Sequence, residues 1–184
     1  PKGTLNYKML TFKPKDLVDT LAIELINNDI PWESAHGLLS DYYFKKGDYA
    51  NCIKEIAVII AERPSYDIPY KDLISKLVDG GKLDEAIEFL VPLYKLKPDY
   101  FATKWLGQVL LRQNKYKEAL NYLQQAVRFK EVDSQTYYNL AGAYYLNKQN
   151  DEALAALQKS INLNPQNKLA INFYNQLSAL AKKK

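Results

Sequence analysis

The sequence predicts an all-α fold, a solenoid of four helix–turn–helix units, and three recurring sets of residues lead to this prediction. Leucines recur at intervals of 33 or 34 residues, at Leu39, Leu73, Leu106 and Leu140. A small residue recurs in the same rhythm, at Cys52, Ala86, Ala119 and Ala153. A larger aliphatic residue follows each of these four positions later, at Ile56, Leu90, Leu123 and Leu157. A repeat of this length that preserves small and large apolar positions indicates one supersecondary unit stacked on copies of itself.

Two segments precede the first unit. Residues 14–32 are predicted to form an N-terminal capping helix, because Pro14 suits a first helical turn and Asp16 suits the positive end of a helix. Residues 1–13 alternate roughly between apolar and polar side chains without a partner strand, and we interpret them as a linker or the remnant of an upstream domain. The chain begins at Pro1 rather than Met, which favours the hypothesis that it was cut from a longer protein, with any targeting segment outside it.

The four units are predicted at residues 33–66, 67–99, 100–133 and 134–167. Each combines two runs of apolar residues at helical spacing with a break between them. The residue at the break is expected to take a positive φ, because the chain must leave the first helix sharply. Glycine suits this conformation, asparagine tolerates it and lysine suits it least. The four residues at the break are Gly47, Gly81, Asn114 and Lys148.

The small residue of each second helix has a packing explanation, since the two helices of a hairpin are expected to cross closely there. Prolines are expected to end three of the second helices, at Pro64, Pro98 and Pro165, whereas Glu131 takes this place in the third unit. Pro92 lies inside the second helix of the second unit and removes a backbone donor. We expect a kink there, at about 3 kcal/mol unless it is relieved.

The pattern resembles the tetratricopeptide repeat, a helix–turn–helix unit of about 34 residues, over residues 33–167 without a gap. The similarity is most specific in the fourth unit, in Tyr137-Tyr138-Asn139-Leu140, Ala143-Tyr144-Tyr145, Asp151-Glu152-Ala153-Leu154 and Asn164-Pro165. The resemblance implies a right-handed α-solenoid with a concave groove. It also implies a capping helix, followed by a basic tail, in residues 168–184.

In the resembled fold, the first helix of each unit lines the groove. The groove residues that the resemblance implies are Phe44, Lys71, Val78, Phe101, Lys104, Gln108, Leu111, Arg112, Tyr138 and Tyr145. Lys104, Gln108 and Arg112 are spaced by four, so they share one helix face and are expected to hold a carboxylate or several backbone carbonyls. Tyr138 and Tyr145 combine apolar surface with a polar tip, which is typical of binding hot spots. The alternative is that the aromatic residues only pack and the charges are only solvated.

One ligand class of the family, the acidic carboxy-terminus of cytosolic chaperones, is not expected here. Lys104 and Asn139 match two positions that such a ligand needs in the resembled proteins. Gln108, Leu169 and Phe173 stand where that clamp needs an asparagine and two basic residues. A protein or peptide partner of acidic character is still favoured over a nucleic acid, because the formal charge of +4 is mild and weakly spread.

Composition excludes two further classes. No apolar run approaches the ~20 residues that span a bilayer, so membrane insertion is not expected. The charged fraction of 25% and the hydrophobic fraction of 47% are those of a globular chain. The single cysteine, Cys52, cannot form an internal disulfide, which leaves the compartment open with a preference for the cytoplasm.

No catalytic constellation is visible in the sequence. His36 is interpreted as a hydrogen-bonded core residue and Cys52 as a small core residue. No pair of metal ligands and no phosphate-binding glycine loop occurs. We therefore predict a protein that is not an enzyme, holds no cofactor and binds a peptide or partner protein in its groove. Two alternatives stay open, a structural or regulatory appendage of an upstream enzyme domain and a self-associating scaffold that uses Tyr94 and Tyr122.

Overall fold

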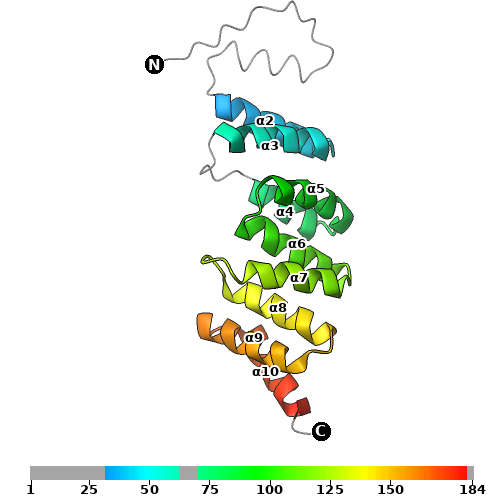
Figure 1. Cartoon of the computed structure of the whole chain (residues 1–184). Coiled ribbons are helices and arrows are strands. Elements are labelled where there is room, and N and C mark those ends of the chain that lie inside the picture. Colours follow the sequence, from blue (N-terminus) through cyan, green and yellow to red (C-terminus); the bar gives the residue numbers. More distant parts are fainter. Residues whose placement is uncertain (1–31, 63–69, 182–184) are drawn as a thin grey trace, which may run out of the picture. The chain divides into compact units, whose positions relative to one another are not determined.

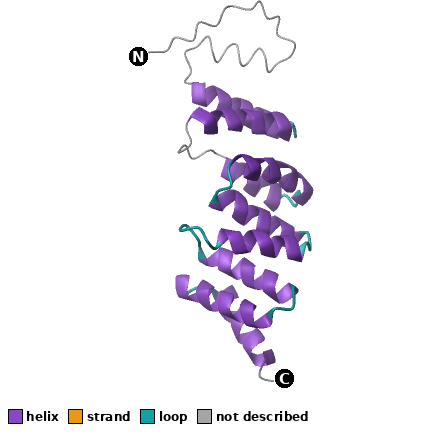
Figure 2. Cartoon of the chain, in the orientation of Figure 1, coloured by secondary structure: helices purple, strands orange, loops and turns teal. Residues whose placement is uncertain are grey.

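The computed structural model describes residues 32–62 and 70–181, which form helices joined by short turns (Figure 2). The chain divides into two compact units between Ile68 and Pro69. The linker at residues 1–13, the capping helix expected within 14–32, Pro64 and the terminal lysines fall outside the described residues. The all-α fold class is confirmed for the described ranges, in which no strand occurs.

The first unit contains a helix hairpin formed by α2 (Trp32–Lys45) and α3 (Tyr49–Glu62). The second helix of this hairpin has a buried apolar side made by Cys52, Ile56 and Ile59. These residues are spaced by four and three, so one side of α3 packs against its partner helix.

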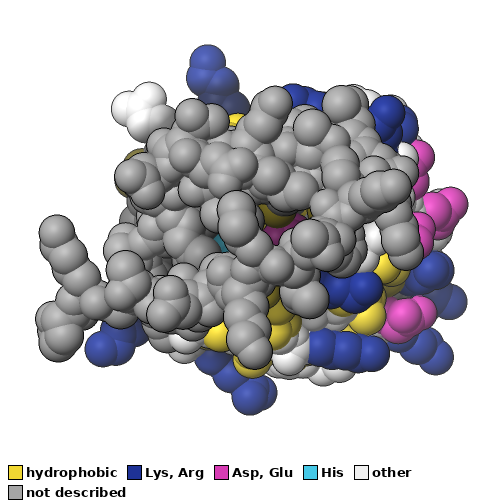
Figure 3. Space-filling view, turned by 90° about the horizontal axis from the view of Figure 1, so that it is seen from above, with side chains coloured by type: hydrophobic (Ala, Val, Ile, Leu, Met, Phe, Trp, Pro, Cys, Tyr) yellow, Lys and Arg dark blue, Asp and Glu magenta, His cyan; other side chains and the backbone are white. Residues whose placement is uncertain are grey.

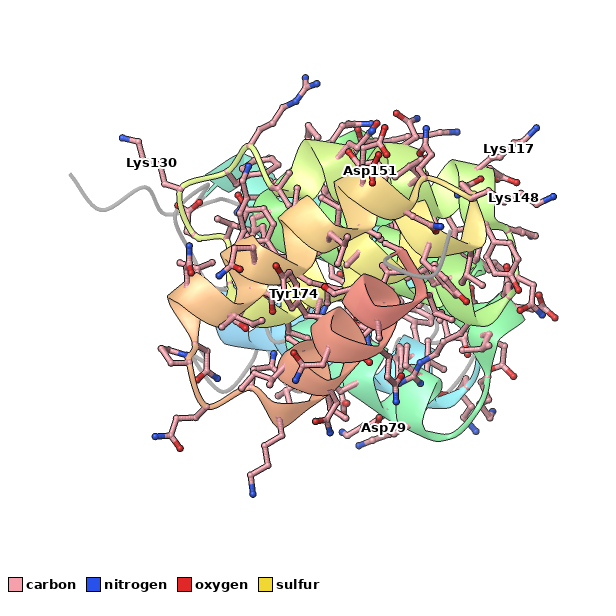
Figure 4. The ribbon with its side chains drawn as sticks, turned by 90° about the horizontal axis from the view of Figure 1, so that it is seen from below. Asp79, Lys117, Lys130, Lys148, Asp151 and Tyr174 are labelled. Carbon is pink, nitrogen blue, oxygen red and sulfur yellow. The ribbon has the colours of Figure 1, made fainter. Side chains whose placement is uncertain are left out.

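The described part of the second unit is a stack of helices in chain order (Figure 1). The helices are α4 (Tyr70–Asp79), α5 (Leu83–Leu96), α6 (Tyr100–Arg112), α7 (Tyr116–Ala126), α8 (Ser134–Leu146), α9 (Asn150–Leu163) and α10 (Lys168–Ala181). Successive helices pack on each other, and α4–α5, α6–α7 and α8–α9 form hairpins. α10 packs on α9 and takes the place predicted for the capping helix, with Tyr174 where the two helices meet (Figure 4).

Small residues let the two helices of each hairpin approach closely. The small residues and the aliphatic residues one turn later are all buried: Ala86, Leu90, Ala119, Leu123, Ala153 and Leu157. Gly107 of α6 marks an even closer approach, because a Cβ built on it would lie 2.5 Å from Cγ of Leu123. The alanines follow from the sequence repeat, whereas the need for a glycine at position 107 arises from this tertiary contact.

The turns inside the hairpins adopt the predicted positive φ. The values are 74° at Gly47, 72° at Gly81, 62° at Asn114 and 64° at Lys148. In each turn the following residue donates its N–H to the carbonyl five positions earlier, as Gln149 does to Tyr144 at 2.9 Å. This hydrogen bond is part of the Schellman helix ending. Lysine at position 148 therefore occupies a conformation that favours glycine.

Replacing Lys148 by glycine is expected to stabilise the protein by about 0.5–1 kcal/mol, because glycine adopts the left-handed conformation without strain. Urea denaturation of the wild type and Lys148→Gly measures this difference in the free energy of unfolding. Lys148→Ala is the control, since it removes the charged side chain but keeps the Cβ, and no gain is expected from it. Equal gains in both variants would place the effect in the side chain and contradict the prediction.

The first helices from α6 onward begin with a capping side chain. The capping residues are Asp99, Asp133 and Asn167, which are 34 residues apart. The side-chain oxygen of each accepts the backbone N–H three residues later, at 2.8, 2.7 and 3.2 Å. Such caps satisfy donors that a helix start otherwise leaves unpaired. Their spacing is a sequence signal that the apolar repeat does not include.

Prolines act as predicted at two helix ends. Pro98 and Pro165 follow the ends of α5 and α9 by two residues. Pro92 lies at an exposed position inside α5, and the helix continues beyond it. The carbonyl that Pro92 deprives of a donor belongs to Glu88, an exposed residue where water can replace the lost hydrogen bond.

The first helices of the second unit form one face of the stack. α4 contacts α6 and α6 contacts α8, whereas no comparable contact joins α5 to α7 or α7 to α9. Helices on the inner side of a curved stack lie closer together, so the first helices form the concave side of this unit. In Figure 4, Asp79 at the end of α4 lies on the opposite side from Lys117 of α7 and Asp151 of α9.

Candidate functional site

The concave side of the second unit is lined by α6, α8 and α10. α6 contributes Lys104, Gln108 and Arg112, which the spacing of four places on one side of the helix. α8 contributes Tyr138 and Tyr145. The two groups lie on helices in direct contact, so the structure brings the predicted polar and aromatic residues onto one face.

Lys104 is already engaged within the chain. Its Nζ donates a hydrogen bond to Oδ2 of Asp133, the cap of α8, and lies 5.6 Å from the centroid of the Tyr100 ring. Burial opposes ionisation of Asp133, but the hydrogen bonds from Lys104 and Thr136 outweigh it and hold the pKa of Asp133 below its ordinary value. The carboxylate that Lys104 is expected to hold is thus supplied by the chain itself.

Arg112 is an exposed cation at the end of α6. Its Nη1 donates to the backbone carbonyl of Val78 at 3.3 Å, which links α6 to α4. Gln108 lies one turn earlier and is half-buried. The guanidinium has five N–H donors, so one hydrogen bond to Val78 leaves others for a ligand.

Tyr138, Tyr145 and Phe173 form an aromatic cluster between α8 and α10. The ring centroid of Phe173 lies 6.2 Å from that of Tyr138 and 5.4 Å from that of Tyr145, with interplanar angles of 74° and 89°. Both contacts are edge-to-face, an arrangement that aromatic rings favour. Tyr138 is half-buried, whereas Tyr145 is 40% exposed. The two predicted tyrosines therefore meet through a residue of the capping helix, which the repeat pattern does not assign to the groove.

Three of the predicted groove residues lie deeper than expected. Val78 is only 2% exposed, so its side chain belongs to the core rather than to the groove surface. Leu111 is half-buried and packs against the core cluster of α7 to α10. Phe101 is half-buried too, and its ring centroid lies 6.0 Å from that of Trp105. The apolar stripe predicted along the groove is therefore mostly a packing surface, except at Tyr145.

Two predicted residues do not enter this face. Phe44 belongs to the first unit, where its ring centroid lies 5.6 Å from that of Tyr49. The side chain of Lys71 falls outside the described residues. The candidate site is therefore assembled from α6, α8 and α10.

The residues considered for catalysis are structural in this fold. His36 Nδ1 lies 2.5 Å from Oε2 of Glu55, so a hydrogen bond joins α2 to α3, as predicted for this histidine. Burial, followed by the charges of nearby carboxylates, raises the pKa of Cys52 to about 12, which keeps the thiol neutral and unreactive. Across residues 32–62 and 70–181, no group of three His, Cys, Asp or Glu side chains is placed to hold a metal. None of the helices in these ranges is long and apolar enough to cross a membrane.

Charged side chains do not gather into one patch on the described surface that Figure 3 shows. Lys and Arg side chains stand at separate points around this surface, with Asp and Glu side chains among them on one side. In Figure 4, Lys130 projects away from the helices on the side opposite Lys117 and Lys148. Charge therefore singles out no region of the visible surface.

A second hollow lies among α7, α8 and α9. Its volume is about 200 Å³, and its lining includes Tyr137, Tyr144, Glu152 and Lys159. Nζ of Lys159 lies 5.6 Å from the centroid of the Tyr137 ring, and the Tyr144 hydroxyl accepts a hydrogen bond from Gln124. Because its polar groups are engaged with one another and its charges cancel, this hollow indicates no ligand class.

Comparison with protein families identifies one match. The sequence profile described as the tetratricopeptide repeat matches residues 72–134 and 106–168, which together span more than half of the chain. A comparison with curated proteins finds no match.

Several solved structures share the fold. MamA from Desulfovibrio magneticus RS-1, residues 41 to the end, has a TM-score of 0.60 and 21% identity, covering 82% of this chain and 86% of that chain. YrrB, a TPR protein with an unusual peptide-binding site, has a TM-score of 0.58 and 24% identity, covering 66% and 63%. The first TPR of Spaghetti (RPAP3), bound to the HSP90 peptide SRMEEVD, has a TM-score of 0.57 and 24% identity, covering 60% and 90%.

Proposed function

The chain belongs to the tetratricopeptide repeat family, and from this premise we propose that it is a non-catalytic interaction module that binds a peptide segment of a partner protein. The binding surface is the concave face formed by α6, α8 and α10. Solvent-exposed aromatic side chains beside fixed hydrogen-bond donors are typical of such surfaces.

The observation that carries this proposal is the position of Tyr145. Its ring is 40% exposed on the concave side and is held in place by the edge-to-face contact with Phe173. A rigid aromatic ring loses little conformational freedom on binding, so it contributes more affinity than a flexible side chain of equal area.

α6 supplies the polar part of the surface. Arg112 has donors left for the backbone carbonyls or an acidic group of a bound peptide, and Gln108 lies beside it. A ligand carboxylate at Lys104 would have to replace Asp133. Any acidic contact is therefore placed at Arg112 rather than at Lys104.

Two of the similar structures support a peptide ligand. One was solved with the HSP90 peptide SRMEEVD, and the other is described by its peptide-binding site. Both are at 24% identity, so they support the binding mode and not the identity of the peptide.

The scaffold alternative receives less support. Tyr94 and Tyr122 pack edge-to-face on each other, with ring centroids 5.4 Å apart, and the Tyr94 hydroxyl donates to Gln125. Both tyrosines are half-buried. They therefore serve contacts within the chain first, which leaves less surface for self-association.

The test is selection of a displayed library of random peptides on the intact protein, followed by affinity measurements on the selected peptides. Tyr145→Ala is expected to weaken binding about tenfold or more, because it removes the exposed aromatic anchor. Tyr122→Ala is the matched control, since it truncates a tyrosine of α7 away from the concave face, and binding is expected to persist. Circular dichroism establishes that both variants stay helical.

Two results would contradict the proposal. One is a failure to select any peptide whose binding depends on Tyr145. The other is an oligomer that survives dilution in light scattering and dissociates only in Tyr122→Ala, which would favour the scaffold.

A further inference from the structure

Two neighbouring helices of the concave face are almost free of charge. In a chain with 25% charged residues, α8 contains none and α10 contains only Lys168, at its first position. α6, by contrast, contains Lys104 and Arg112. Depletion of charge together with enrichment of tyrosine is the compositional mark of the buried centre of protein interfaces.

The same two helices carry four of the exposed large hydrophobic side chains. Tyr145 and Leu146 of α8 are 40% and 44% exposed, and Leu169 and Leu180 of α10 are 60% and 55% exposed. Leu146 and Leu180 are one repeat of 34 residues apart, so they occupy equivalent positions on α8 and α10. Leu169 and Leu180 lie about three helical turns apart, on one line along α10.

Phe173 joins these side chains into one surface. It lies between Leu169 and Leu180 along α10, and its ring contacts both Tyr138 and Tyr145 of α8. We call the surface formed by Tyr145, Leu146, Leu169, Phe173 and Leu180 the α8–α10 ledge.

The rest of the exposed surface of α10 is polar. Asn172, Asn175 and Gln176 are exposed there. A terminal helix of a repeat array needs such a polar outer side for solubility. The exposed leucines therefore stand out at the edge that faces α8 and cannot be explained by a general lack of polar residues on α10.

Resting on the proposed function, we propose that the α8–α10 ledge binds an uncharged, apolar segment of the partner, with aliphatic or aromatic side chains seated on Tyr145, Leu146 and Leu180. Electrostatics supports this choice of ligand. The ledge itself has no charged group, and the positive charge of Lys104 is already matched by Asp133. A charged segment would lose its hydration on the ledge without gaining an opposite charge, whereas an apolar segment would gain from removing the exposed leucines from water.

The test uses the displayed random-peptide library and the synthetic acidic peptide SRMEEVD as probes of the intact protein. The selected peptides are expected to be enriched in Leu, Ile, Phe and Met and depleted in Asp and Glu. Leu180→Glu is expected to weaken their binding about tenfold or more, because it places a charge on the ledge. Asn175→Glu is the matched control, since it adds the same charge on the polar side of α10 and leaves binding unchanged.

The outcomes separate this inference from the proposed function. Peptides that depend on Tyr145 but are enriched in acidic residues, or that bind Leu180→Glu as well as the wild type, would overturn the apolar ledge and leave groove binding standing. Tighter binding of SRMEEVD than of the selected neutral peptides would also overturn the ledge. A library that yields no peptide dependent on Tyr145 would overturn both. Both glutamate substitutions are at exposed positions, and circular dichroism checks that the helices persist.

Discussion

Replacing Gly107 by alanine is expected to destabilise the protein by about 1–3 kcal/mol, because a well-packed core has no room for the added methyl group. The new Cβ would lie 2.5 Å from Cγ and 2.9 Å from Cδ2 of Leu123, and 3.3 Å from the backbone nitrogen of that residue. Leu123 is fully buried, so its side chain has little freedom to move aside. Thermal and urea denaturation of Gly107→Ala measures the loss.

Gly142 provides a control of the opposite sign. It also lies inside a first helix, but a Cβ at this position would meet nothing within 4 Å. Alanine is expected to stabilise the helix there by about 0.5–1 kcal/mol, since it restricts the unfolded backbone more than glycine does. A Gly107→Ala variant as stable as the wild type would show that α6 and α7 can separate at no cost, in contradiction to the close crossing.

Removing the side chain of Asp133 is the second large effect. Asp133→Ala is expected to destabilise the protein by about 2 kcal/mol, because it removes the cap of α8 and leaves the Lys104 ammonium without its carboxylate partner. The loss is measured by urea denaturation at neutral pH. Asp99→Ala is the matched control, since Asp99 caps α6 while the Nζ of Lys97 lies 4.0 Å from its carboxylate. A cost of about 1 kcal/mol is expected there.

Asp133→Asn separates the two roles of this residue. Asparagine caps helices as well as aspartate, so this variant is expected to retain the cap and to lose only the charge of the Lys104 partner. The pKa of Asp133 is lowered in the folded protein, so its ionisation stabilises the fold above the ordinary value of 3.8, and this contribution is lost as the pH falls. The advantage of the wild type over Asp133→Asn is therefore expected at neutral pH and should shrink under acid conditions. A difference between the two proteins that does not change with pH would contradict the role of the charge.

Features set by spacing within one repeat are predictable from the sequence. The apolar rhythm predicts two helices per unit, and the breaks at Gly47, Gly81, Asn114 and Lys148 all take the positive φ that the helix ending needs. The capping residues show the same 34-residue spacing, but they are polar and therefore escape a search for apolar positions. The continuation of α5 through Pro92 depends instead on exposure, which the sequence alone does not give.

The candidate site was less predictable, because its residues meet across repeats. Lys104 is on the predicted face, but its partner Asp133 comes from the next unit. Val78 has the right position in its helix for the groove and is nevertheless buried. Phe173 belongs to the capping helix and becomes part of the aromatic cluster. The absence of charged residues from 134–146 and from 169–181 is the one sequence signal that points to the α8–α10 ledge.

The sequence by itself determined the helix hairpins, their left-handed turn residues and the small residues at the helix crossings, because these depend on local backbone geometry and on spacing along one chain segment. Only the tertiary structure decided that Lys104 is neutralised by Asp133, that Gly107 admits no Cβ and that α8 and α10 share one apolar surface. The reason is physical: the distance and angle between packed helices determine which side chains of different helices meet, and a periodic pattern specifies neither.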